Sequence, residues 1–399
     1  MAKKLLVIGI AAILVAVTVR EVSDRASIAD AEGNTKKLDE VYARGLAFLM
    51  KSQNADGSWN DPTGAPDVAF TALSLAAVMS GPAETREKLA AQLEKGFAYV
   101  LANQQKDGGF YHPEKLPCLM NYRTAVSLTA LAEADPGKYK EPIQKAREFL
   151  CDTQFSETYC SGKPENWFYG GWGYEDESDD EQKHNPSPDL SNAAMSLEAL
   201  KAAGVPPDSE VWKRAVAFLN RCQNRSESND LTKELEKEGI TRADDGGFTY
   251  TPKASKPNEG PGGDPKKGLR SYGSMTYAGL KSFIYANVKK DDPRVQAAYA
   301  WVQKHYSLDE NPEMGAQGLY YYYHTFAKAL DAYGEGTLTD AAGTKHAWAE
   351  ELVDRLGDLQ KEDGSWTNDK DRWFEGHPAL VTAYCLRSLN VCRKWQPAK

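Results

Sequence analysis

The sequence predicts an all-α protein, an (α/α)6 toroid of six helical hairpins over residues 32–399. Two observations lead to this prediction. One phrase recurs six times: an apolar helical segment, a Gln, a turn that pairs Gly with an aromatic residue, and a second helical segment. The second segments are rich in Ala, Ser, Thr and Leu, which suits a crowded inner ring. The first segments carry more Lys, Glu and Arg, which suits an outer ring that faces water.

The six turns define the order of the hairpins along the chain. Hairpins of this kind stack into an open solenoid or close into a ring. A strong Asp-Gly-Ser-Trp turn at both ends favours closure, because a solenoid usually has atypical end repeats. We expect Trp59, Phe110, Phe248 and Trp366 to pack between hairpins. The turns are Asp56-Gly57-Ser58-Trp59, Asp107-Gly108-Gly109-Phe110, Gly170-Gly171-Trp172-Gly173-Tyr174, Asp245-Gly246-Gly247-Phe248, Gln317-Gly318-Leu319-Tyr320 and Asp363-Gly364-Ser365-Trp366.

The N-terminal segment has the pattern of a targeting sequence. Lys3 and Lys4 precede an uncharged, mostly apolar run at residues 5–19. This run is short for a bilayer span but suits the apolar region of a secretory signal. We therefore expect residues 1–31 to be a signal peptide, or an uncleaved anchor that associates with a membrane through residues 5–19. Either alternative predicts an exported protein, periplasmic or extracellular.

Charge and cysteine usage exclude several classes of function. Lys and Arg number 48 and Asp and Glu number 57, a net charge of −9, which argues against binding to nucleic acid through the overall field. Neither CxxC nor HExxH occurs, so the common zinc spacings are missing and we expect no metal and no cofactor. Cys151 and Cys160 flank a short loop and form the best candidate disulfide.

The recurring Gln–Asp-Gly-Ser-Trp unit resembles the QW repeat of squalene and oxidosqualene cyclases, which is shared with the β subunits of protein prenyltransferases. The resemblance extends from Ala43 to Leu389. It implies a closed α/α toroid with a central cavity, and an apolar, isoprenoid-like ligand in that cavity. Such toroids also host sugar chemistry, so a glycan is the alternative ligand.

The resemblance is closest where the third turn is followed by Asp189-Leu190-Ser191-Asn192. In the cyclases the corresponding motif is Asp-x-Asp-Asp, whose middle Asp protonates an alkene or epoxide. Matched position by position, Ser191 replaces that acid and Asn192 replaces the last one, and a serine hydroxyl cannot protonate a double bond. Asp67 and Asp189 remain as candidates for a displaced acid. Both precede predicted helices, so helix capping is their alternative role.

A second part of the resemblance concerns His324. The stretch from Tyr321 to Thr325 is similar to the one that carries the zinc-binding His of the prenyltransferases. The Asp-x-Cys that should accompany it is missing between Tyr272 and Tyr285. A lone His without a thiolate partner is a weak metal ligand, so we expect His324 to be a hydrogen-bonded residue of the inner ring.

Aromatic residues cluster where the turns meet the second helices, and a closed toroid would gather them around one mouth. In the cyclases such rings stabilise carbocations, and here they would contact an apolar or sugar-like ligand. The candidates for ligand contact are Trp172, Tyr174, Tyr272, Tyr322, Tyr323, His324, Trp373 and His377.

Three hypotheses for the function follow. The first is an exported toroid that binds a ligand or partner and lacks the protonation chemistry of the cyclases. The second is a terpenoid cyclase or isomerase with a displaced acid at Asp67 or Asp189. The third is a glycan-active enzyme, which would require two carboxylates that face each other across a sugar.

Overall fold

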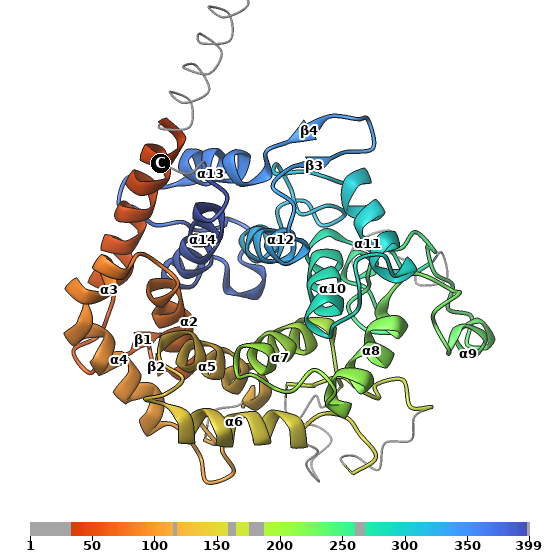
Figure 1. Cartoon of the computed structure of the whole chain (residues 1–399), viewed down its shortest axis with the longest axis horizontal. Helices are drawn as coiled ribbons and strands as arrows, with labels where there is room; N and C mark the ends of the chain where they lie inside the picture. The colour runs from red at the N-terminus through yellow and green to blue at the C-terminus, as the bar shows by residue number, and fades with distance from the viewer. Residues whose placement is uncertain (1–32, 115–117, 159–164, 175–186, 260–267, 397–399) are drawn as a thin grey trace, which may run out of the picture.

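The computed structural model describes residues 33–114, 118–158, 165–174, 187–259 and 268–396. Helices dominate these ranges and form two concentric rings (Figure 1). The predicted signal peptide or anchor lies outside the described residues, and so does Cys160 of the candidate disulfide. No helix in the described ranges is long and apolar enough to cross a membrane.

In the described ranges six helices form the inner ring, which Figure 1 shows enclosed by the outer one. Each packs against the next, and α14 packs against α2, so the ring is closed. The inner helices are buried on all sides: α2 buries ten of its twelve residues, most of them Ala, Leu, Val or Ser. Small side chains allow such close approach, as the sequence predicted. The inner helices are α2 (Val68–Met79), α5 (Met120–Ala134), α7 (Leu190–Ala202), α10 (Gly273–Tyr285), α12 (Leu319–Tyr333) and α14 (Pro378–Arg393).

The outer ring consists of amphipathic helices. In α8, Val211, Ala215 and Phe218 recur at helical spacing and are buried, whereas Lys213 faces solvent. Each outer helix precedes the inner helix of its own hairpin, which gives the six hairpins predicted. The outer helices are residues 33–51, α4 (Ala90–Ala102), α6 (Lys140–Asp152), α8 (Glu210–Cys222), α11 (Pro293–Lys304) and α13 (Trp348–Leu359).

The remaining elements are short. They are α3 (Ala83–Lys88), α9 (Thr232–Lys237), the 3-10 turns η1 (Lys256–Asn258) and η3 (Arg372–Phe374), and two antiparallel pairs, β1 (Trp59–Asn60) with β2 (Pro66–Asp67) and β3 (Leu338–Thr339) with β4 (Lys345–His346). Since no larger sheet occurs in the described ranges, the predicted all-α (α/α)6 toroid is confirmed.

The repeated Gln holds neighbouring hairpins together. The side-chain amide of Gln53 donates to the Gly57 carbonyl in its own turn at 2.9 Å. It also donates to the carbonyl of Gln92, in the first turn of α4, at 3.0 Å. Gln104, Gln154 and Gln223 make the equivalent pair of bonds. Gln360 donates to Gly364 and to Val41 in the first outer helix, so the same contact closes the ring.

The turn glycines lie against the backbone of the next outer helix. Gly364 has a φ of +89°, and a Cβ built on it would lie 2.4 Å from the Arg44 carbonyl oxygen. Only glycine combines that φ with so close an approach. The aromatic residue that follows is buried: the indole N–H groups of Trp59 and Trp366 donate to the Leu49 and Leu356 carbonyls. Both bonds lie within one hairpin, and the Trp366 ring also lies against Gly45 of the first outer helix, as predicted for packing between hairpins.

Candidate functional site

A cavity of about 570 Å³ lies at the amino ends of the inner helices, and all six helices or their caps contribute to its wall. Trp373 and Phe374 are 42% and 55% exposed, so the cavity reaches the surface beside them. The aromatic wall consists of Phe70, Tyr122, Tyr174, Tyr250, Tyr272, Tyr321, Trp373, Phe374 and Tyr384, and the aliphatic part includes Leu73, Leu119, Met275 and Leu380.

The hydroxyl groups of the wall tyrosines pair mostly with one another. Tyr122 and Tyr384 approach to 3.2 Å between their oxygens, as do Tyr174 and Tyr250. Tyr321 pairs with the Ser191 hydroxyl at 3.1 Å. Because these polar atoms are already hydrogen-bonded, the cavity offers mainly the carbon surfaces of the rings to an occupant.

The single arginine in the wall is neutralised. Arg123 of α5 donates from Nη2 to Oδ2 of Asp67 at 2.8 Å, and their side chains are 7% and 2% exposed. Oδ1 of Asp67 accepts from the amide of Ala69 at 2.8 Å, so Asp67 also caps α2, as predicted for the alternative role. Its carboxylate is therefore committed to a cation and a helix end.

Asp189 lies behind the wall rather than in it. It is buried and caps α7, where it accepts from the amide and side chain of Asn192, both at 2.9 Å. The Tyr250 hydroxyl is also bonded to it, and Tyr250 does line the cavity. Burial raises the pKa of Asp189 to about 6, against the lowering effect of these hydrogen bonds.

Glu375 is a carboxylate of the wall that sequence reasoning did not identify. It is 1% exposed, and it accepts from the Tyr321 amide at 2.8 Å and from the Asn368 side chain at 2.7 Å. It thereby caps α12 from a loop of the last hairpin. Burial raises the pKa of Glu375 to about 7, while the bond from Asn368 lowers it. Among the described residues no Lys or Arg forms an ion pair with it.

The loop that carries Glu375 holds two aromatic side chains at the cavity mouth. Trp373 and Phe374 have φ values of 59° and 64°, a left-handed conformation that costs energy for residues other than glycine. Asn368 anchors the loop through its amide to the Glu375 carbonyl at 2.8 Å. The Arg372 guanidinium lies 4.4 Å from the Trp373 ring and bonds to Glu259 at 2.7 Å.

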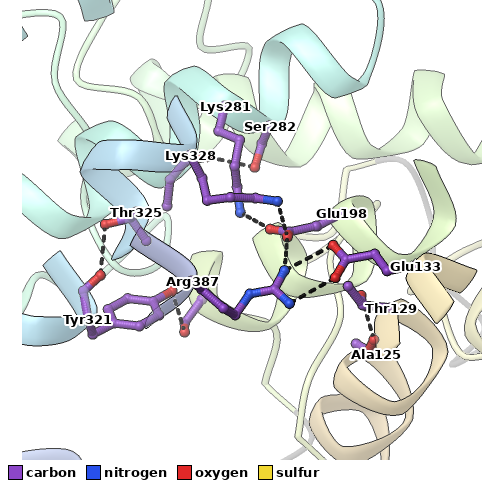
Figure 2. A network of polar contacts seen from close by, with 12 residues as sticks. Ala125, Thr129, Glu133, Glu198, Lys281, Ser282, Tyr321, Thr325, Lys328 and Arg387 are labelled. Atoms are coloured by element: carbon purple, nitrogen blue, oxygen red, sulfur yellow. Dashed lines mark hydrogen bonds and ion pairs between the residues drawn. The ribbon is translucent and has the colours of Figure 1, made fainter. Parts of the chain in front are cut away.

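The far end of the inner ring is filled by charged residues, which Figure 2 shows. Glu198 of α7 contacts Lys281 and Lys328, the latter at 2.9 Å, and Arg387 forms a bidentate pair with Glu133 at 2.9 and 3.0 Å. The three cations come from α10, α12 and α14, and the carboxylates from α5 and α7. This cluster forms the floor of the toroid.

The structure brings together Tyr174, Tyr272 and Trp373 of the eight aromatic and histidine candidates, together with Asp67. The others lie elsewhere. Trp172 is buried and donates its indole N–H to the Leu150 carbonyl at 2.6 Å, so it packs within its hairpin. His377 caps α14, accepting from the Leu380 amide at 3.4 Å, and its ring contacts Phe70 edge-on.

The run of four tyrosines divides according to the helical period. Tyr321 faces the cavity. Each following residue is turned by about 100° around the helix, so Tyr322 and Tyr323 point toward the outer helices and donate to the Ser307 and Leu308 carbonyls. His324 is buried below the wall, and its ring stacks on Tyr384 with centroids 5.5 Å apart, but the expected hydrogen bond is not formed at Nδ1, which has no partner among the described residues. Among the described residues no group of three or more His, Cys, Asp or Glu could hold a metal ion.

Comparisons with known proteins concern the fold. No protein-family model matches the chain, and no curated protein matches its sequence. Among solved structures, type II terpene cyclase MstE from Scytonema superposes with a TM-score of 0.55 and 16% identity over 90% of this chain and 99% of its own. A GH76 α-mannanase of Bacteroides thetaiotaomicron superposes with a TM-score of 0.55 and 11% sequence identity, over 90% of this chain and 96% of its own. A protein from Actinoplanes superposes with a TM-score of 0.51 and 18% sequence identity, over 89% of this chain and 99% of its own. At these identities the likeness establishes the fold alone: the chain forms an α/α toroid of the terpenoid-cyclase-like kind.

Proposed function

We propose that this protein binds an apolar, isoprenoid-like ligand in the tyrosine-lined cavity. The observation that carries the proposal is the wall itself: nine aromatic side chains surround about 570 Å³, a volume typical of ligand sites. The paired hydroxyls remain hydrogen-bonded when an apolar molecule enters, so binding leaves few polar atoms unsatisfied. Each Å² of apolar surface removed from water contributes about 25 cal/mol.

A structural neighbour supports the choice of ligand class. A variant of cyclase MstE was solved in complex with geranylgeranyl dihydroxybenzoate, which carries a long isoprenoid chain. That complex concerns another protein at 15% identity, and it makes the same ligand class a reasonable first choice here.

The proposed function does not include the proton-initiated cyclisation of the cyclases. Ser191 lines the cavity at the position where the resembling motif carries its acid, and Asn192 bonds to Asp189. The purified protein is therefore expected to give no polycyclic product from squalene or oxidosqualene. If Ser191→Asp with Asn192→Asp gained such activity, the cavity would still accommodate a cyclase substrate.

A cyclase or isomerase with a displaced acid is the second candidate, and one observation favours it. Glu375 is a buried carboxyl in the cavity wall, and burial raises its pKa to about 7. It is better placed for this role than Asp67, which pairs with Arg123, or Asp189, which lies behind the wall. A product from wild-type protein that Glu375→Gln abolishes would promote this candidate over pure binding.

A glycan is the weaker alternative ligand. Sugars are held by side chains with free hydrogen-bonding capacity, and the wall hydroxyls of Tyr122, Tyr174, Tyr250 and Tyr384 are paired with each other. The GH76 neighbour shares the fold only. We also propose export, guided by residues 1–31; a reporter fused after Gly33 should appear outside the cytoplasm, and a cytosolic reporter would refute this part.

The binding proposal is tested by calorimetric titration of the purified protein with farnesol, an isoprenoid alcohol. Ser191→Trp, which places an indole in the cavity, should weaken binding at least about tenfold. Ala202→Trp, at the exposed end of the same helix, is the matched control and should bind as wild type does. Equal binding by both variants, or no binding by wild type, would contradict the proposal.

A further inference from the structure

The cavity wall has an imbalance of charge that concerns the chemistry of its occupant. Three carboxylates, Asp61, Asp67 and Glu375, face a single cation, Arg123. Arg123 is already paired with Asp67 at 2.8 Å. Among the described residues of the wall no further Lys or Arg is present to contact an anionic ligand. Of the two other carboxylates, Asp61 accepts hydrogen bonds within its own turn, and Glu375 forms no ion pair with a described Lys or Arg.

Glu375 is the deeper of these two groups and has an unusual environment. Its hydrogen-bond donors are neutral dipoles: the Asn368 side chain and the backbone amides of Leu319, Tyr320 and Tyr321 at the start of α12. The amino end of α12 adds only about half a positive charge. Burying a carboxylate without a full counter-charge is costly, and proteins usually supply a cation or a proton. Here the described residues supply neither Lys nor Arg.

The aromatic rings of the wall also favour a cationic partner. Tyr321 and Tyr384 lie beside Glu375, and Phe70 and Trp373 belong to the same cavity wall. Aromatic faces attract ammonium groups, most strongly when water is excluded. Most of the wall tyrosine hydroxyls are hydrogen-bonded to one another or to Ser191, so the ring faces and the carboxylates are the main electrostatic features left to an occupant.

We propose that the preferred ligand is an apolar molecule with a cationic group, which lies against Glu375 as the counter-charge that this carboxylate lacks. This inference rests on the proposed function and deepens it by naming the ligand class. The apolar body occupies the ring-lined cavity, and the ammonium contacts Glu375 and the adjacent aromatic faces. An isoprenoid amine satisfies both requirements.

The tyrosine hydroxyls and the thiol that lie against Glu375 are neutral near pH 7. Burial raises the pKa of Tyr320, Tyr321, Tyr384 and Cys385 and lowers the pKa of His377. Since burial also raises the pKa of Glu375 to about 7, that group changes charge in this range, and a cation should bind better as pH rises. The titratable groups that lie against it are Tyr320 and Tyr321 of α12 and Tyr384 and Cys385 of α14. Asp61, Asp67 and Arg123 line the same cavity, and Asp371, Arg372 and His377 are near Glu375 in the chain.

The experiment compares three probes that share one isoprenoid tail: farnesylamine, farnesol and farnesoate, which are cationic, neutral and anionic at neutral pH. Calorimetry with wild-type protein should give farnesylamine an affinity at least about tenfold higher than farnesol, with farnesoate weakest. The affinity for farnesylamine should rise between about pH 6 and pH 8, whereas that for farnesol should not. These measurements need no variant, so they decide the matter even if a substitution unfolds the protein.

Glu375→Gln should bring the affinity for farnesylamine down to that for farnesol. Glu238→Gln removes a charge from the surface pair with Lys253, far from the cavity wall, and should preserve the difference. If farnesol binds and farnesylamine binds no better, the cation inference is wrong while the proposed function stands. If none of the three probes binds, the proposed function itself is wrong.

Discussion

Arg123 and Asp67, from the starts of two neighbouring inner helices, form an ion pair of 2.8 Å in the cavity wall. Both side chains are almost fully buried, so each neutralises a charge that would otherwise be costly. The pair joins α2 to α5 and removes both groups from the set that could contact a charged ligand. This ion pair therefore both stabilises the contact between two inner helices and neutralises two charges of the cavity wall.

Removing one partner of this pair should be strongly destabilising. Asp67→Asn keeps a side chain that can cap α2 but removes the negative charge that lies 2.8 Å from the buried Arg123. We expect the free energy of unfolding to fall by about 3–5 kcal/mol. Chemical denaturation measures this. Glu238→Gln, which breaks an exposed pair with Lys253, should change stability by about 1 kcal/mol or less. Equal effects of the two substitutions would refute the assignment.

Ring closure can be tested at two glycines with the same backbone conformation. Gly364 and Gly343 have φ values of +89° and +87°, but a Cβ on Gly343 would meet nothing within 4 Å, whereas one on Gly364 would clash with Arg44. Gly364→Ala should therefore lower the unfolding temperature clearly more than Gly343→Ala. Similar losses would mean that the last turn does not pack against the first outer helix.

The charged floor should depend on Glu198, which contacts Lys281, Lys328 and Arg387 (Figure 2). Glu198→Gln leaves these buried cations with one fewer carboxylate. We expect a loss of about 3–5 kcal/mol in the free energy of unfolding. Glu148→Gln, on the exposed face of α6, is the matched control and should stay within about 0.5 kcal/mol of wild type. A small effect at Glu198 would show that the floor is not held by this network.

Stability should depend on pH through Glu375. Its pKa is raised from 4.5 to about 7 in the folded state, so the folded protein holds this proton more tightly than the unfolded chain does. The resulting stabilisation is fully present below about pH 4.5 and is lost as pH rises through about 7. Glu375→Gln should remove a decline of about 3 kcal/mol between those values. Parallel pH profiles of the two proteins would contradict this account.

Sequence reasoning predicted the fold because its determinants repeat. The Gln makes the same pair of contacts in five of the six predicted turns, and each copy adds to the pattern; Gln317 of the fifth turn accepts from Arg372 instead. Closure of the ring was predicted from the strong turns at both ends of the chain. The hydrogen bond from the Gln360 side chain to the Val41 carbonyl makes that closure.

The cavity wall was harder to predict because one residue of helical rotation decides which side chains face the axis. Tyr321 lines the cavity, but Tyr322 and Tyr323 bond to carbonyls between the rings, and no repeat signal separates them. Glu375 belongs to a loop unique to the last hairpin, so periodicity could not reveal it. Pairings such as Tyr122 with Tyr384 join residues 262 positions apart and required the closed ring.

The central claim is that the tyrosine-lined cavity holds an apolar, isoprenoid-like ligand. The measurement that tests it most directly is a crystal structure of the protein saturated with farnesol. The account predicts ligand density in contact with Phe70, Tyr321 and Tyr384, beneath Trp373. Density at another place, or an empty cavity in crystals of protein that binds farnesol in solution, would contradict it.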